Sequence, residues 1–320
     1  MTNGPNSLPP GTIVERYEIA DLLGSGGFSR VYRGRSLKSG RTVVIKEFLP
    51  KVGSGASAAN PGTASNGGDA FRLEHGRGMF LQEARVLARL KHPNIVRVRN
   101  FVLANDTAYL VMDYEPGENL SRYIKARHGG LSTQFLLTVF PPLLDALSLI
   151  HSRALLHLDV KPANIHLRPG GSPLLLDFGA VHQFATTRRH QPGQVLTSGF
   201  APYEQYRLSG YVGPWSDIYS VGATMRTCIE GAAPPPAPQR EDRDPMHPAS
   251  QAFRRRYPAH LLEAIDWAME LDPLLRPQTA DALLKALLPD AEARAALRSE
   301  ALPDPEARAA PSTESEAREP

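Results

Sequence analysis

The sequence lacks the features that mark secreted and nucleic-acid-binding proteins. Its one cysteine, Cys228, excludes an internal disulfide bond. The N-terminal stretch MTNGPNSLPP has neither the basic nor the apolar region of a secretion signal. Basic residues number 36 and acidic residues 33, and no block of Lys and Arg with interleaved aromatic residues occurs. We therefore expect a cytoplasmic protein without a nucleic-acid partner.

Long apolar runs are also absent. The most apolar segment, LSTQFLLTVFPPLLDALSLIH, is interrupted by Pro141 and Pro142 and by polar positions. It contains no run of roughly 18 uncharged apolar residues, so we expect no membrane span. The composition is nevertheless 42% apolar, which is enough to bury one two-lobed core or two small ones.

The chain divides into a β-rich part, a helical part and two polar tails. Residues 1–16 are rich in Pro, Gly and Asn and predict a flexible tail. Strand-like stretches follow from YEIADLLG to LVMDY, with one helical stretch at MFLQEARVLARLKH and a small, polar insertion at residues 51–70 that we expect to be flexible. The region 120–288 is mainly helical in its periodicity. From Pro289 on, eight acidic and four basic residues with several prolines predict a disordered tail.

A glycine-rich stretch, GSGGFSRV at residues 24–31, lies between two predicted strands. By itself such a stretch more often forms a hairpin turn than a phosphate-binding loop. Lys46, at the end of the apolar strand VVIK, favours phosphate binding because it would place a cation where triphosphate oxygens lie. Glu83 on the following helix offers this lysine a carboxylate partner.

The stretch HLDVKPANIH, residues 157–166, concentrates polar groups on one predicted loop. Asp159 can accept a proton from an attacking hydroxyl group, and Lys161 can offset the charge of a transferred phosphate. Asn164 and Asp177, thirteen residues apart, supply the hard oxygen ligands that Mg²⁺ prefers. This set of residues predicts a phosphoryl-transfer site.

From Tyr17 to about Leu287 the sequence resembles the eukaryotic-like (Hanks-type) serine/threonine protein kinases, and specifically their bacterial branch. The resemblance rests on eight landmarks in order, which are GSGGFSRV, VVIK, Glu83 in FLQEARVL, HLDVKPAN, DFG, TSGFAPYE, SDIYSVG and Arg276 in DPLLRPQT. It implies an α+β, bilobal protein-kinase fold. A small β-rich N-terminal lobe with one helix would cover residues 17–115, and a larger, mainly α-helical C-terminal lobe residues 116–287.

The resemblance also implies the roles of site residues. Lys46, paired with Glu83, would bind the α- and β-phosphates of ATP, while Asp159 would be the catalytic base. Lys161 would contact the γ-phosphate, and Thr197 would link it to Asp159. Mg²⁺, or Mn²⁺ in its place, would be bound by Asn164 and Asp177. The structural residues would be Glu204, Asp217 and Arg276. The ATP-binding residues would further include Leu23, Gly24, Ser25, Gly26, Gly27, Phe28, Val31, Val44, the gatekeeper Met112, the hinge residues Asp113, Tyr114 and Glu115, and His166.

Several positions depart from the family pattern. Ser29 replaces the third glycine of the loop, and 36 residues separate Lys46 from Glu83, more than is usual. His166 stands where the family generally has an aliphatic residue under the adenine ring, which predicts weaker nucleotide affinity. Leu158 stands where many kinases have an arginine that binds a phosphorylated residue of the activation loop.

The Leu158 substitution bears on regulation. Leucine cannot bind a phosphate group, so we expect activity that does not strictly depend on activation-loop phosphorylation. The candidate phosphorylation sites are Thr186, Thr187 and Thr197.

Two alternatives stand beside an active protein serine/threonine kinase. A pseudokinase or scaffold would bind nucleotide and partner proteins, but such proteins usually lack at least one of the catalytic residues, all of which are present here. A small-molecule phosphotransferase is disfavoured because such enzymes lack the Lys161 position and the TSGFAPYE segment. The resemblance further implies protein substrates, a cognate protein phosphatase and a transient dimer for autophosphorylation.

Overall fold

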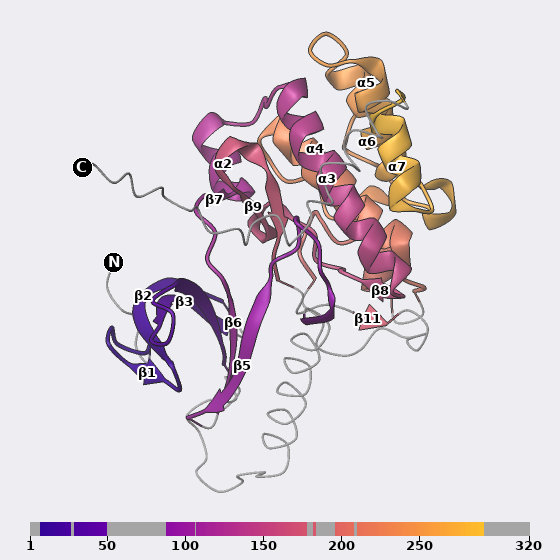
Figure 1. Cartoon of the computed structure of the whole chain (residues 1–320). Coiled ribbons are helices and arrows are strands. Elements are labelled where there is room, and N and C mark those ends of the chain that lie inside the picture. The colour runs from indigo at the N-terminus through magenta and orange to yellow at the C-terminus, as the bar shows by residue number, and fades with distance from the viewer. Residues whose placement is uncertain are drawn as a thin grey trace, which may run out of the picture.

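The computed structural model describes residues 7–26, 29–49, 88–105, 107–177, 182–183, 196–207 and 210–290. Within these ranges the chain forms two lobes, with a β-sheet below a group of helices in the view of Figure 1. This arrangement agrees with the predicted two-lobed α+β architecture. The predicted insertion at 51–70, most of the predicted helix at 79–92 and the tail beyond residue 290 lie outside the described residues.

The N-terminal lobe is built on a six-stranded sheet. Its strands are β1 (Ile13–Val14), β2 (Tyr17–Ser25), β3 (Ser29–Ser36), β4 (Thr42–Phe48), β5 (Val98–Ala104) and β6 (Thr107–Asp113). They lie in the order β1-β2-β3-β4-β6-β5, and every neighbouring pair is antiparallel. Strands β5 and β6 meet at a turn, where Asn105 has a φ of 52°, a conformation that asparagine tolerates.

The sheet begins earlier than the sequence predicted. Residues 7–14, which we expected in a tail ending at residue 16, belong to the N-terminal lobe, since β1 pairs with β2. The backbone N–H of Leu8 donates to the Tyr32 hydroxyl at 3.2 Å, and Val14 is buried. This segment covers apolar side chains of the sheet. Its Pro and Gly content favoured the prediction of a tail, so the short strand was not predicted.

The C-terminal lobe is mainly helical. Its helices in the described ranges are α2 (Leu120–Arg127), α3 (Thr133–Ser152), α4 (Pro214–Glu230), α5 (Ala249–Ala252), α6 (Ala259–Ala268) and α7 (Ala280–Leu287). Side chains of Asn119, Ser132 and Thr279 cap the N-termini of α2, α3 and α7 by accepting backbone N–H groups. Helix α4 is buried along most of its length, so it forms the centre of this lobe.

Helix α3 runs through Pro141 and Pro142 as one element, although we expected this pair to interrupt the apolar segment. Each proline removes a backbone donor from the helix, and burial of flanking residues such as Phe140 and Leu143 offsets that loss. Among the described residues, α3 is the one helix whose length and composition would allow it to cross a membrane, and half of its most apolar window is buried in the protein.

Several short strands and turns complete the structure. Strands β7 (Glu118–Asn119), β9 (Ile165–Leu167) and β10 (Pro173–Leu175) form a three-stranded sheet, and β8 (Leu155–Leu156) pairs with β11 (His182–Gln183). Residues 118–119 form β7 because they pair with β9. Five 3₁₀ turns are also described, namely η1 (Pro162–Asn164), η2 (Pro169–Gly171), η3 (Tyr203–Tyr206), η4 (Ala237–Arg240) and η5 (Pro273–Leu275).

The strand register of the large sheet decides which side chains face the helical lobe. Lys46 lies opposite Val31 and Leu110, and Val44 lies opposite Met112. Opposed residues of an antiparallel pair project on the same face, and Leu110 and Met112 belong to the core that continues into α3 and α4. The other face forms a separate buried cluster, which includes Tyr17, Ile19, Tyr32, Val43, Ile45, Tyr109 and Val111.

Candidate active site

The loop between β8 and β9 brings Asp159, Lys161 and Asn164 together. The Lys161 Nζ atom lies 2.8 Å from Oδ2 of Asp159. The Asn164 side-chain amide donates to the backbone oxygen of Asp159 and to its Oδ2 atom, both at 2.9 Å, because the turn η1 carries Asn164 back towards Asp159. The side chains of Asp159 and Lys161 are 18% and 21% exposed, so this carboxylate is partly screened from water but open to a substrate.

Thr197 closes this group from a distant part of the chain. Its hydroxyl accepts a hydrogen bond from Lys161 Nζ at 2.8 Å and donates one to Asp159 Oδ1 at 2.7 Å. The lysine, the threonine and the aspartate therefore form a closed ring of hydrogen bonds. Such a ring fixes the carboxylate oxygens of Asp159 relative to the Lys161 cation.

A buried aspartate accepts hydrogen bonds from the backbone of the same loop. Asp217 on α4 accepts the backbone N–H groups of His157 and Leu158 at 2.9 Å and 2.7 Å, and its Oδ2 atom lies 2.8 Å from His151 Nε2. Burial alone would raise the pKa of Asp217, but the hydrogen bond and charge of His151 and the nearby His157 outweigh it, so the pKa is lowered from its ordinary value. The loop that carries Asp159 is thus held by an ionised carboxylate.

Leu158 has an unusual backbone conformation for a leucine, with a φ of 57°. Its N–H is bound by Asp217, and its carbonyl accepts a hydrogen bond from Gln205 Nε2 at 3.1 Å, so the backbone is fixed on both sides. The residue is only 5% exposed. An apolar side chain therefore fills the place of the arginine that the family often has.

Lys46 reaches from the sheet into the C-terminal lobe. Its Nζ atom lies 2.7 Å from Asp177 Oδ1, and the lysine is 7% exposed. The Leu176 N–H donates to the Asn164 carbonyl at 2.8 Å, which places Asp177 next to the segment that carries Asn164.

The oxygen groups in this region fit a magnesium site. Because the amide nitrogen of Asn164 is directed at Asp159, its Oδ1 atom is the group left to meet a cation, together with the carboxylate of Asp177. Within the described ranges no three His, Cys, Asp or Glu side chains gather into a metal site. Mg²⁺ is commonly bound by one or two protein oxygens, with phosphate and water completing its shell.

Several of the predicted nucleotide-binding residues lie on strands of the large sheet. Val31, Val44 and Met112 share the face that carries Lys46. A Cβ atom added at Gly24 would meet no atom of the described chain within 4 Å, so packing does not itself require glycine there. Leu23 is 49% exposed. Of the remaining residues of this loop, Ser25 lies opposite Arg30, and the Gly26 N–H donates to the Ser29 carbonyl.

His166, which we expected to weaken nucleotide affinity, contacts the segment that connects the two lobes. Its Nε2 atom lies 3.1 Å from the backbone carbonyl oxygen of Glu115 in the hinge. The imidazole therefore links the strand β9 to the segment that connects the two lobes.

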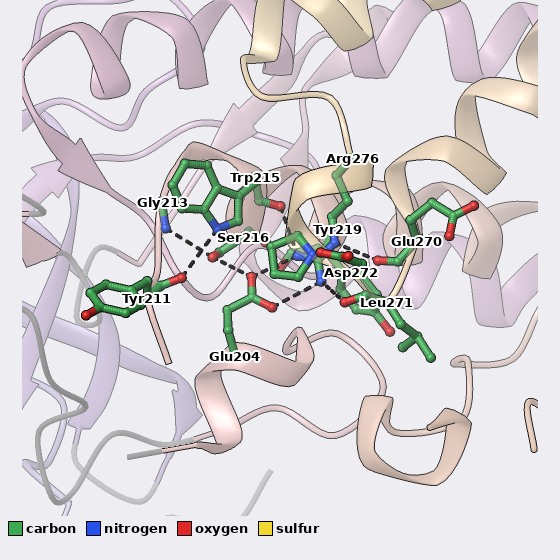
Figure 2. Close-up of polar contacts among 12 residues, drawn as sticks. Glu204, Tyr211, Gly213, Trp215, Ser216, Tyr219, Glu270, Leu271, Asp272 and Arg276 are labelled. Atoms are coloured by element: carbon green, nitrogen blue, oxygen red, sulfur yellow. Dashed lines mark hydrogen bonds and ion pairs between the residues drawn. The ribbon is translucent and has the colours of Figure 1, made fainter. Parts of the chain in front are cut away.

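Glu204 and Arg276, two of the residues predicted to be structural, form a buried ion pair. Figure 2 shows the Glu204 carboxylate pointing at the Arg276 guanidinium, with both oxygens engaged at 2.8 Å and 3.0 Å. The side chains of Arg276 and Glu204 are 0% and 5% exposed. Ser216 donates to Glu204 at 2.7 Å, and the Arg276 guanidinium lies 4.9 Å from the centre of the Tyr219 ring. This network ties the segment after Thr197 to α4.

Some predicted residues are not placed and some important ones were not predicted. Glu83, Gly27, Phe28, Thr186 and Thr187 lie outside the described residues. No sequence pattern pointed to His151 or Gln205, which contact Asp217 and Leu158. The only feature that could have marked His151 is its place, as a polar residue, in the last turn of the long apolar helix α3.

Comparisons with known proteins agree with this geometry. A family model described as "Protein kinase domain" matches residues 17–299. A probable serine/threonine-protein kinase of Clostridium perfringens is 27% identical over 84% of this chain and 37% of its own length. The serine/threonine-protein kinase PknA of Mycobacterium tuberculosis is 29% identical over 70% of this chain and 48% of its own.

A solved structure titled "PpkA-294 apo form" is 33% identical, with a TM-score of 0.75, and the match covers 88% of this chain and all of that one. The chain spans less than half of the length of the two curated relatives. The predicted protein-kinase fold is confirmed by the family model and by the solved structure. The chain belongs to the protein kinase family, in its bacterial Hanks-type serine/threonine branch.

Proposed function

We propose that this protein is a serine/threonine kinase that transfers the γ-phosphate of ATP to hydroxyl groups of proteins. The observation that carries the proposal is the ring of Asp159, Lys161 and Thr197, beside the oxygen groups of Asn164 and Asp177. Membership of the family and the serine/threonine kinase relatives support the same reaction. Because the chain spans only part of those relatives, their own substrates and partners are not carried over.

In this mechanism the chain acts mainly by positioning and charge. Asp159 accepts a hydrogen bond, and then the proton, from the attacking hydroxyl of the substrate. Lys161 neutralises charge that develops on the transferred phosphate. Thr197 bonds both the lysine and the Asp159 carboxylate and so fixes their relative positions. Lys46 binds the phosphates of the nucleotide. Mg²⁺ held by Asn164 and Asp177 would neutralise the charge of the phosphate oxygens.

The scaffold alternative has less support. Each described catalytic side chain is hydrogen-bonded or ion-paired within the site, and none is replaced by a residue unable to do its chemistry. The cytoplasmic location, the cognate protein phosphatase and the transient dimer stay predictions.

The proposal is tested by transfer of labelled phosphate from ATP to serine or threonine. Wild-type protein with Mg²⁺ should label itself or a generic protein substrate, and Asp159→Asn should lower the rate by about a hundredfold or more because the general base is lost. Phosphoamino-acid analysis should find phosphoserine or phosphothreonine. Absence of transfer by folded wild-type protein with either Mg²⁺ or Mn²⁺ would contradict the proposal and favour the scaffold.

The same assay has a matched pair of controls at Thr197. Thr197→Val removes the hydroxyl that bonds Asp159 and Lys161, whereas Thr197→Ser keeps it. We expect kcat to fall by roughly tenfold or more for valine and to stay close to wild type for serine, since a misplaced catalytic group slows the reaction. Equal kcat values for the two variants would show that the ring does not position Asp159.

A third prediction concerns regulation. Leu158 cannot bind a phosphate group, and its side chain is buried rather than turned towards solvent. We therefore expect the double variant Thr186→Ala, Thr187→Ala to retain activity within about threefold of wild type, because position 158 has no arginine that could bind a phosphorylated threonine. Initial rates on a generic protein substrate measure this. A loss of more than about tenfold would show that phosphorylation orders the site by another route.

A further inference from the structure

Gln205 is a buried amide that contacts the loop carrying Asp159. It lies in the turn η3, directly after Glu204, and is only 2% exposed. Its Nε2 atom donates to the Leu158 carbonyl oxygen at 3.1 Å. Within the described part of the chain no group donates to its Oε1 atom. The bond to Leu158 is therefore the contact that a change of this side chain would remove.

The bond is made to a peptide group in an unusual conformation. Leu158 has a φ of 57°, which costs a leucine roughly 1–2 kcal/mol and persists only where the surrounding structure holds it. The carbonyl of this peptide is bonded by Gln205, and its N–H, which belongs to Asp159, donates to His157 Nδ1 at 3.3 Å. A rotation of the peptide would break both bonds. Because Asp159 follows directly, the orientation of this peptide sets the direction in which its side chain leaves the backbone.

The stretch of chain that carries Gln205 is itself fixed at two other points. Thr197, eight residues earlier, donates to the Asp159 carboxylate at 2.7 Å. The neighbouring Glu204 is bonded to Arg276 through two buried hydrogen bonds, as Figure 2 shows. One stretch of chain therefore contacts two successive residues of the loop, one through its carboxylate and one through its backbone.

We propose that Gln205 is a positioning residue for catalysis, which holds the Leu158 carbonyl and thereby the direction of the Asp159 side chain. Thr197 bonds the carboxylate itself, whereas Gln205 fixes the backbone that carries it. A general base must lie within hydrogen-bond reach of the substrate hydroxyl, so a small change in its direction slows proton transfer. This inference rests on the proposed function, since it takes Asp159 as the base.

The first test replaces Gln205 with a residue of similar length that cannot donate. Gln205→Met should lower kcat by about tenfold, because the carboxylate loses its fixed direction. The KM for ATP should stay within about twofold, since the lost bond is not to a nucleotide-binding residue. Gln278→Met is the matched control, because Gln278 also donates to backbone carbonyls, those of Pro273 and Arg276, both at 2.8 Å, but not to the loop that carries Asp159. Its kcat should stay close to wild type.

The second test uses pH to change the donor. In Gln205→Glu a neutral carboxyl group has an O–H that can donate to Leu158, whereas the ionised carboxylate can only accept. Burial and the nearby Asp217 carboxylate, which binds the Leu158 N–H, should raise the pKa of the introduced group. The adjacent Glu204 is already neutralised by Arg276. The ratio of the variant's kcat to that of wild type should therefore rise as the pH falls from about 8.5 to about 6.

The outcomes separate this inference from the proposed function. Far-UV circular dichroism at each pH confirms that the assayed proteins are folded. A kcat of Gln205→Met within about twofold of wild type would overturn the role of Gln205, and so would a ratio for Gln205→Glu that does not change with pH. In both cases wild-type protein still transfers phosphate. Absence of transfer by folded wild-type protein would instead overturn the proposed function, and the role of Gln205 with it.

Discussion

Replacing Arg276 with methionine is expected to lower the free energy of unfolding by about 3–5 kcal/mol, because it leaves the Glu204 carboxylate buried without its cation. Both partners are almost fully buried and meet through two hydrogen bonds of 2.8 Å and 3.0 Å. Arg276 also donates to the backbone carbonyls of Glu270 and Leu271 at 2.6 Å and 2.8 Å, which would lose a donor as well. Urea unfolding followed by far-UV circular dichroism measures the change.

An exposed ion pair provides the control for this variant. Lys285 and Asp281 on α7 lie 2.9 Å apart, but the lysine side chain is 62% exposed. Lys285→Gln should therefore change the free energy of unfolding by no more than about 0.5 kcal/mol, since water competes with such a pair. A loss at Arg276 as small as the loss at Lys285 would mean that the buried network does not stabilise the C-terminal lobe.

The order of the elements and much of the site could be predicted from local sequence. Successive residues of a strand point to opposite faces, so Val44 and Lys46 share one face of the strand predicted at VVIK, and the strand register places Met112 opposite Val44 on that face. The motif HLDVKPAN fixes Asp159, Lys161 and Asn164 within six residues, so their proximity follows from a single loop. In both cases the information lies in neighbouring residues, which is where patterns of sequence are most reliable.

The contacts that sequence reasoning missed join residues far apart in the chain. His151 and Asp217 are 66 residues apart, Gln205 and Leu158 are 47 apart, and His166 and Glu115 are 51 apart. Each depends on how α3, α4 and the small sheet pack, and a side chain's partner across such a packing leaves no local periodic signal. The strand β1 was missed for a related reason, because only its pairing with β2 distinguishes it from a polar tail.

Replacing Asp217 with asparagine is expected to damage stability and catalysis together. The carboxylate accepts the backbone N–H groups of His157 and Leu158 and contacts His151 Nε2, and an amide of the same shape turns a donor towards at least one of these groups. We expect the free energy of unfolding to fall by about 3 kcal/mol, as for other buried donors left without an acceptor. Because the same N–H groups hold the loop that carries Asp159, kcat should fall by about a hundredfold.

The pH dependence and a matched control distinguish this role of Asp217 from a general loss of stability. Its pKa is lowered below the ordinary value of 3.8, so its stabilising contribution is complete above that pH and is lost as the pH falls towards the folded-state value. The stability difference between wild type and Asp217→Asn should therefore shrink on acidification below about pH 4.

Asp266 on α6 also accepts two backbone N–H groups, those of Ala249 and Ser250, but away from the catalytic loop. Asp266→Asn should lose stability while the folded protein keeps its kcat, and a similar loss of kcat in both variants would show that Asp217 does not position Asp159.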